Sequence, residues 1–254
     1  MKTSIHSSFI STPIFELLKE SVNISRCIAK SIETQPLCEY IMQTTFLKMT
    51  GATEQKLKCI CWEMATYDYD YRYRYLSNKD RGECSSYAEK KSIFDELLLD
   101  MKKMDSHYNF DNLFPKNVKK EMCDDIKNII ISNVSGTAIE KWENRSFLLF
   151  KKDPFKFTNE NLFANKTKNN EAKLPYVFFE NKLKDYYENV VRRHRNRCAH
   201  NLKSYQNNLP TLNTLIKPDY DYENYFHMFS VLMLLDHLFM KLYDEYQKLL
   251  NNVY

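Results

Sequence analysis

Glycine is scarce in this chain, which has only three glycines and seven prolines among its 254 residues. Turns and hairpins depend on these two residue types, because glycine reaches left-handed backbone angles and proline fixes φ. A sandwich or barrel with many strands would need more of both. Hydrophobic residues make up 43% of the sequence, which suffices for a buried core. We therefore predict an all-α fold, a bundle of helices that forms a single domain over residues 1–254.

Helix start signals and apolar spacing place the expected helices along the chain. We expect helices to start after the Ser11-Thr12-Pro13 cap and near Pro36, and to span residues 53–76, 86–106, 115–134, 138–150, 174–202 and 220–252. Gly51 is expected to separate the second helix from the third, with Thr53 as the N-cap of the third. The polar stretch 151–173 is expected to form a long mobile loop.

Aromatic and charged residues alternate over residues 67–75, which read YDYDYRYRY. Strict alternation suits a half-exposed strand, but acid-before-base pairs four residues apart favour a helix by roughly 0.2–0.5 kcal/mol each. These pairs are Asp68 with Arg72 and Asp70 with Arg74. On a helix, Tyr67, Tyr71 and Tyr75 would share one face. Packing against neighbouring helices is the favoured use of these rings, and stacking on nucleic-acid bases is the alternative.

The segment 220–252 is apolar on nearly all sides and is expected to lie inside the bundle or at a subunit interface. Its two histidines, His227 and His237, are interpreted as core residues with satisfied hydrogen bonds. Charged residues interrupt this segment, and the first fifteen residues are too polar for a signal-peptide core. We therefore expect a cytoplasmic protein with no membrane segment.

Charge and cysteine content narrow the class of partner only slightly. The formal net charge of +4 permits nucleic-acid binding without requiring it, because the basic residues are spread along the chain. Seven cysteines, with no CxxC pair, are expected to be reduced thiols. No phosphate-binding loop or metal-ligand spacing is present in the sequence, so we expect neither a cofactor nor a metal.

The sequence RRHRNRCAHN, residues 192–201, is the strongest candidate for chemistry. Histidine can transfer a proton near neutral pH, and a guanidinium can stabilise charge on a phosphoryl group. On a helix, Arg193 and His200 lie on nearly one face, with Asn196 one turn from each. Arg195 lies roughly 140° around the helix from His200. Arg195 and a motif histidine can therefore act at one site only if the arginine side chain wraps round the helix, if the helix is irregular, or if the histidine comes from a second subunit. Arg193 and Arg195 both remain possible phosphate-binding residues.

These residues resemble the motif of the HEPN superfamily, a group of all-α nucleases. That motif is an arginine, a polar residue, three to five further residues and a histidine. Arg195, Asn196 and His200 fit its shortest form, and Arg193 followed by His194 fits its longest form with the same final histidine. The position of the motif also fits, near the end of a helix and ahead of a loop and a final apolar helix.

The resemblance implies a metal-independent endoribonuclease that leaves 2′,3′-cyclic phosphate and 5′-hydroxyl ends. His200 would be the general acid or base, Arg195 would hold the scissile phosphate, and Asn196 would orient one of them. It also implies a homodimer with a composite active site, and a role as a toxin or an antiphage-defence effector. A separately encoded antitoxin or sensor protein would be a further partner.

The remaining basic residues near the motif are expected to bind the RNA substrate. They are Arg192, Arg193, His194, Arg197 and Lys203. A non-catalytic HEPN-like module that binds a nucleotide, RNA or a partner protein is the alternative to an enzyme. A helical scaffold with an accidental likeness, in which the basic run is only a solvated helix face, is the third interpretation.

Overall fold

The computed structural model describes residues 4–77, 82–158, 164–165, 176–200 and 224–253, and it confirms the all-α prediction. The helices of the first half are α1 (Ile5–Ser11), α2 (Phe15–Arg26), the 3₁₀ turn η1 (Ile32–Thr34), α3 (Gln35–Tyr67), α4 (Tyr69–Ser77) and α5 (Tyr87–Met104). Those that follow are α6 (Phe110–Leu113), α7 (Lys116–Val134), α8 (Ala138–Trp142), α9 (Asn144–Lys152), α10 (Asn181–Tyr186), the π-helical turn η2 (Tyr187–Arg192), α11 (Arg193–His200) and α14 (Tyr225–Val253). Two short strands, β1 (Ala164–Asn165) and β2 (Tyr176–Val177), pair antiparallel.

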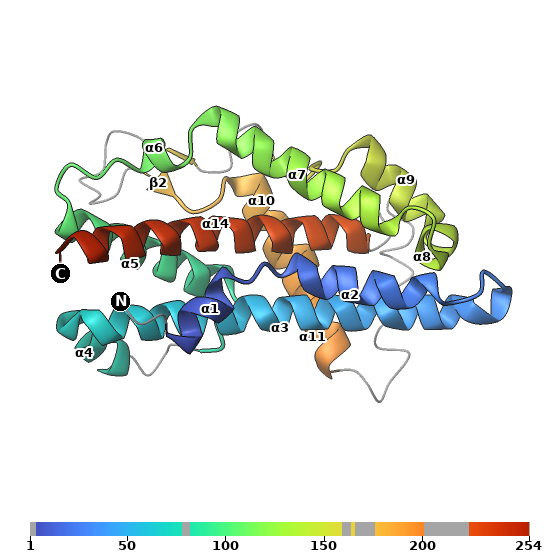
Figure 1. The fold of residues 1–254 in the computed structure, drawn as a ribbon, viewed down its shortest axis with the longest axis horizontal. Helices are drawn as coiled ribbons and strands as arrows, with labels where there is room; N and C mark the ends of the chain where they lie inside the picture. The colour runs from blue at the N-terminus through green and yellow to red at the C-terminus, as the bar shows by residue number, and fades with distance from the viewer. Residues whose placement is uncertain (1–3, 78–81, 159–163, 166–175, 201–223, 254) are drawn as a thin grey trace.

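The two longest helices, α3 and α14, lie along the long axis of the bundle and pack on each other (Figure 1). Helices α1 and α2 cover one side of α3, and α5 and α7 pack against α14. As expected, α14 is apolar on nearly all sides, and it lies inside the bundle of its own chain. Of the two predicted placements, the one inside the bundle is therefore confirmed for the described part of the segment, although Asp244, Lys248, Asn251 and Asn252 in its last turns are exposed.

Helix α3 corrects the predicted break at Gly51. It is one helix of 33 residues, and Gly51 lies within it on the exposed side. A Cβ added at Gly51 would meet no atom within 4 Å, so a close contact does not explain this glycine. Thr53 is not an N-cap, because its Oγ1 donates to the carbonyl of Met49 one turn earlier. Burial of α3 against α14 and α2 outweighs the roughly 1 kcal/mol by which glycine disfavours a helix.

The tyrosine-rich stretch is helical, but it does not continue α3. The backbone is extended at Asp68 (ψ 112°), which ends α3, and α4 starts at the next residue. Both predicted ion pairs of this stretch are absent from the described contacts: Asp68 pairs with Lys103, and Arg72 donates to the carbonyls of Ala65 and Thr66. Arg74 donates to the backbone carbonyl of Asp70. Tyr71 is 1% exposed and stacks on Tyr75, as expected for rings that pack within the fold.

Several helix boundaries also differ from the prediction. Helix α1 was not expected, and its N-cap is Ser4, whose Oγ accepts from the amide of Ser7. The predicted helix 138–150 is divided at Glu143 into α8 and α9. Helix α5 follows its prediction closely, because Ser86 and Glu89 form a reciprocal capping box. Helix α7 also follows its prediction.

The predicted helix 174–202 starts later than expected. Strand β2 occupies residues 176–177, and Phe179 has a positive φ of 57° just before α10. Glu180 caps α10 by accepting from the amides of residues 182 and 183. The predicted loop 151–173 starts inside α9 and includes β1, and the rest of its length falls largely outside the described residues.

A buried ion pair joins the central helices to the N-terminal segment. Lys56 Nζ on α3 lies 2.6 Å from Asp236 Oδ1 on α14, and each side chain is 5% exposed. Asp236 Oδ2 accepts from the amide of Ile14, and Lys56 also donates to the carbonyl of Thr12. Asp236, which interrupts the apolar sequence of α14, therefore fixes the start of α2 against α3.

No described helix is both long and apolar enough to cross a membrane. All seven cysteines are free thiols.

Candidate functional site

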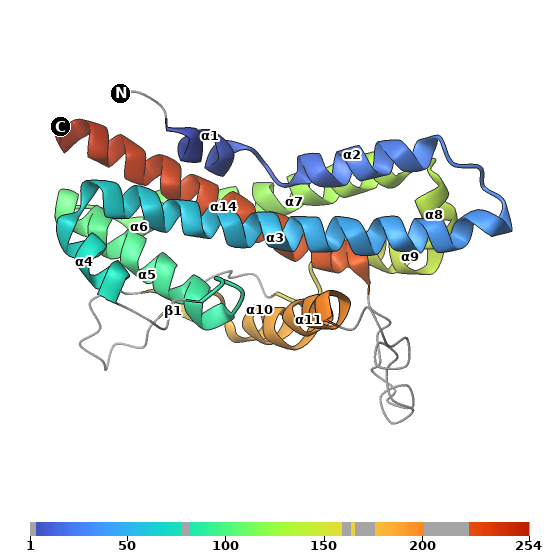
Figure 2. The ribbon, with the colours of Figure 1, turned by 90° about the horizontal axis from the view of Figure 1, so that it is seen from below.

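The π-helical turn η2 leads directly into the helix that carries the RRHRNRCAH motif. Its wider turn changes the direction in which later side chains point, and such turns are frequent at functional sites. Contacts with the start of α5 hold this turn in place: Tyr187 Oη donates to the carbonyl of Ser85 at 2.8 Å, and the amide of Tyr87 donates to Glu188 Oε1 at 2.5 Å. Helix α11 is thereby fixed beside α3 (Figure 2).

The backbone of α11 is α-helical throughout the motif. The irregularity therefore precedes Arg195 and does not lie between Arg195 and His200. At about 100° per residue, the Cα of His200 lies about 20° around the helix from that of Arg193 and about 140° from that of Arg195. The angular separation expected from the sequence is retained, and of the two arginines Arg193 is on the same side as His200.

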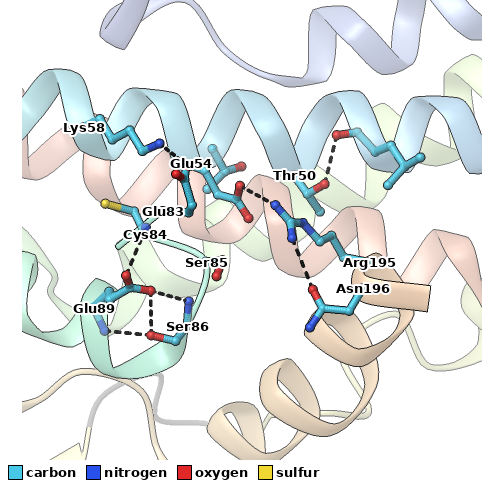
Figure 3. Close-up of polar contacts among 12 residues, drawn as sticks. Thr50, Glu54, Lys58, Glu83, Cys84, Ser85, Ser86, Glu89, Arg195 and Asn196 are labelled. Atoms are coloured by element: carbon cyan, nitrogen blue, oxygen red, sulfur yellow. Dashed lines mark hydrogen bonds and ion pairs between the residues drawn. The ribbon is translucent and has the colours of Figure 1, made fainter. Parts of the chain in front are cut away.

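Arg195 points from α11 toward α3 and forms an ion pair with Glu54 (Figure 3). Arg195 Nη2 lies 3.0 Å from Glu54 Oε2, and the two side chains are 24% and 12% exposed. Arg195 Nη1 also donates to Asn196 Oδ1 at 3.2 Å. The arginine and the amide of the motif therefore act as one hydrogen-bonded unit whose orientation Glu54 determines.

Further charged groups lie beside this pair, on α3 and on the segment before α5 (Figure 3). Lys58 binds Glu83, and this contact lowers the pKa of the Glu83 carboxyl, with a smaller contribution from Arg195. Lys90 is 1% exposed and donates to the carbonyl of Cys84. Burial lowers the pKa of Lys90 to about 8, although neighbouring acids, Glu54 first among them, oppose the shift. The candidate site thus combines cationic and anionic groups whose exposure ranges from the buried Lys90 to the exposed Glu83.

His194 is buried rather than available to RNA, which corrects its predicted role. It is 5% exposed, its Nε2 lies 3.0 Å from Tyr225 Oη, and its ring packs on Phe46. Its Nε2 is also 3.4 Å from Cys198 Sγ. Burial raises the pKa of the Cys198 thiol, but the contacts with His194 and other neighbours outweigh it and leave that pKa below its ordinary value. His194 therefore joins α11 to α14 and α3.

The other predicted RNA-binding residues differ in exposure. Arg193 is exposed, whereas Arg192 pairs with Glu188 at 2.8 Å and Arg197 lies 3.3 Å from the ring of His194. His200 is the last residue of α11, and its side chain is outside the described part of the structure. Lys203 also lies outside the described residues.

His227 is buried as predicted, but only one of its two ring nitrogens has a described partner, and His237 is half-buried rather than in the core. His227 is 1% exposed, and its Nε2 donates to the carbonyl of Asp153 at 2.9 Å, which leaves its buried Nδ1 without a described partner. Burial lowers the pKa of His227 to about 4 and also lowers the pKa of His237. A histidine that stays neutral in this way is a packing residue.

Glu54 is the site residue that sequence reasoning missed. It lies on α3, 141 positions before Arg195, and nothing in the local sequence distinguishes it from a solvent-exposed glutamate. Only the packing of α11 on α3 brings it to the motif. Among the described residues, no group of three or more His, Cys, Asp or Glu side chains could hold a metal ion.

Comparison of the chain with protein-family models, with curated proteins and with solved structures found no match.

Proposed function

We propose that this protein is a metal-independent endoribonuclease whose active site is built on Arg195, Asn196 and His200. The observation that supports this proposal is that the full Arg-polar-x3-His pattern lies on one helix of an all-α bundle, with Arg195 and Asn196 hydrogen-bonded to each other. Arg195 is partly exposed at the surface, so a phosphate can approach it. Asn196 is expected to orient either Arg195 or His200, and its hydrogen bond to Arg195 favours Arg195.

In the proposed reaction, the ribose 2′-hydroxyl of the substrate is the nucleophile. It loses its proton to a base and forms a bond to phosphorus, while the bond from phosphorus to the 5′-oxygen breaks and that oxygen takes a proton. His200 supplies one of these two proton transfers. Arg195 stabilises the charge on the phosphoryl oxygens, and this stabilisation is strongest where a partly buried guanidinium is held in place before the substrate binds.

We propose a separate part in RNA binding for Arg193, and its exposure and position on α11 support it. Arg193 is exposed, and its Cα lies on the same side of α11 as that of His200. We expect Arg193 to contact a phosphate next to the scissile one, and Arg195 to contact the scissile phosphate. Arg197 and Lys203 extend the proposed basic surface, whereas His194 acts by fixing α11.

Purified protein should be incubated with total RNA and with transfer RNA in the presence of EDTA, beside the variants His200→Ala and Arg195→Ala. The wild type is expected to cleave, and both variants are expected to lose cleavage by at least about a hundredfold. Lys48→Ala, a change on α3 outside the motif, is the matched control and should cleave like the wild type. Equal cleavage by all four proteins would contradict the proposal.

The second candidate function is a non-catalytic HEPN-like module that binds RNA, a nucleotide or a partner protein. The ion pair between Arg195 and Glu54 favours it, because a guanidinium already paired within its own chain can serve the fold alone. RNA binding without cleavage, retained in His200→Ala, would favour this module over the enzyme.

The resemblance to the HEPN superfamily leads us to propose three further properties. They are a homodimer, a role as a toxin or antiphage-defence effector, and a separately encoded antitoxin or sensor protein as a partner. The apolar surface of α14 does not add support for the dimer, because it is buried within the chain. Sedimentation of the purified protein with and without RNA tests the dimer directly.

A further inference from the structure

The tyrosines of helix α4 and its surroundings divide between two faces. Tyr71 is 1% exposed and stacks on Tyr75, so these two rings pack within the fold. Tyr69 is 76% exposed and Tyr73 is 69% exposed. Side chains four residues apart on a helix are neighbours, so α4 presents two adjacent rings to solvent. Their exposure leaves both rings accessible to a ligand.

Two exposed arginines flank this pair of rings. At about 100° per residue, Arg72 lies about 60° around α4 from Tyr69, and Arg74 lies about 100° from Tyr73 on the other side. Arg72 donates to two carbonyls at the end of α3, and Arg74 donates to a carbonyl of α4, so both guanidinium groups are held in place. Asp70 is the only acid in the sequence of α4, so this helix has a net positive charge.

Helix α4 lies on the same side of α3 as the motif helix α11 (Figures 1 and 2). Glu54, which holds Arg195, precedes Tyr67 at the end of α3 by 13 residues (67 − 54 = 13), or about 20 Å along the helix axis. A stacked nucleic-acid strand advances about 3.4 Å per nucleotide, so about six nucleotides span this length. One strand can therefore contact Arg195 and also reach α4.

Exposed rings between cationic groups suit a single-stranded nucleic acid. Every base has a face that can stack on an aromatic ring, and the phosphates that follow it attract guanidinium groups. A duplex offers these rings no free base face, because its bases already stack on one another. The chemistry of this surface therefore favours unpaired nucleotides.

We propose that Tyr69 and Tyr73 form a stacking surface for two bases of single-stranded RNA, on the same strand whose scissile phosphate Arg195 contacts. The choice of RNA rests on the proposed ribonuclease function, and the stacking surface gives that enzyme a preference for unpaired substrate. Arg72 and Arg74 attract the phosphates of the stacked nucleotides.

Fluorescence anisotropy in EDTA measures RNA binding without cleavage, with the full chain carrying His200→Ala as the parent protein and a labelled oligouridine of about 12 nucleotides as the probe. Adding Tyr69→Ala or Tyr73→Ala should weaken binding at least about fivefold, because each change removes one stacking contact. The corresponding phenylalanine variants keep the ring and should bind within about twofold of the parent. Tyr40→Ala removes another exposed tyrosine, near the start of α3, and is the matched control that should bind like the parent.

An RNA duplex of the same length should bind the parent and both alanine variants equally. The stacking surface is refuted if the parent shows no saturable binding of the single strand, or if both alanine variants bind it like the parent. An equal loss of duplex binding, or an equal loss in the phenylalanine variants, would also refute it.

Cleavage of RNA by the protein without His200→Ala tests the ribonuclease separately. Cleavage together with unchanged binding by the alanine variants would refute the stacking surface alone. Weakened binding by the alanine variants, with no cleavage, would support the stacking surface and refute the ribonuclease alone.

Discussion

Arg195 and Glu54 form an ion pair across 141 residues of sequence, with 3.0 Å between Nη2 and Oε2. The contact joins the motif helix α11 to α3. The ion pair sets the direction of the Arg195 guanidinium, and it also stabilises the packing of the two helices.

A double-mutant cycle with Glu54→Gln and Arg195→Met should measure this contact. Both side chains are partly exposed, so we expect a coupling free energy of about 1 kcal/mol, between values typical of surface and buried pairs. Urea unfolding of the four proteins gives this energy. A coupling of zero would mean that Glu54 does not hold Arg195 in solution.

The buried pair of Lys56 and Asp236 should contribute far more to stability. Asp236→Ala is expected to lower the free energy of unfolding by about 3–5 kcal/mol, because it leaves the ammonium of Lys56 buried without its charge partner. Lys19→Met, which breaks an exposed pair with Glu16, is the matched control and should change stability by less than about 1 kcal/mol. Urea unfolding measures both changes. If the two variants lower the free energy of unfolding by similar amounts, the burial of Lys56 does not increase the contribution of its ion pair to stability.

Gly51→Ala is expected to stabilise the protein by up to about 1 kcal/mol. The position lies within a continuous helix and has open space around a Cβ, so alanine gains helix propensity without a clash. Gly136→Ala should do the opposite, because Gly136 has a φ of 81°. Thermal unfolding of both variants checks the two signs, and destabilisation by Gly51→Ala would support the helix break that the sequence suggested.

The neutral state of His227 predicts a loss of stability in acid. The folded protein takes up this proton near pH 4 and the unfolded chain takes it up near pH 6.5, so between these values the unfolded state holds more protons. The contribution is complete above pH 6.5 and is lost as the pH falls toward 4. Wild type should lose about 2 kcal/mol more than His227→Gln between pH 7.5 and pH 5. The free energies of unfolding are measured with urea at both pH values. An equal loss in the two proteins would contradict the lowered pKa of His227.

Local sequence signals predicted the elements that depend on local interactions. Helix α5 starts where it was predicted, at a Ser86–Glu89 capping box that is a purely local interaction, and the apolar residues of α14 indicated its burial. The same kind of signal was wrong at Gly51, because packing of α3 against several helices outweighs one unfavourable residue. Asp68 was expected to pair within its own helix, but it pairs with Lys103 of α5.

The candidate site was only partly predictable, because some of its contacts are local in sequence and others depend on the packing of distant helices. Arg195 and Asn196 belong to a contiguous motif that can be recognised along the chain, and they remain together in the structure. Glu54 and the burial of His194 depend on how α11 packs against α3 and α14. Contacts between residues so far apart in sequence leave no periodic pattern from which they could be inferred.

The chemistry of cleavage tests the proposed ribonuclease most directly. Once a cleavage site is mapped, an oligonucleotide carrying it should be compared with the same oligonucleotide bearing a single 2′-deoxy sugar on the 5′ side of the scissile phosphate, both in EDTA. We predict that the first is cut to 2′,3′-cyclic phosphate and 5′-hydroxyl ends by the wild type and not by His200→Ala, and that the second is not cut. Cleavage of the 2′-deoxy substrate, or a 5′-phosphate on the product, would contradict the proposed use of the 2′-hydroxyl as the nucleophile.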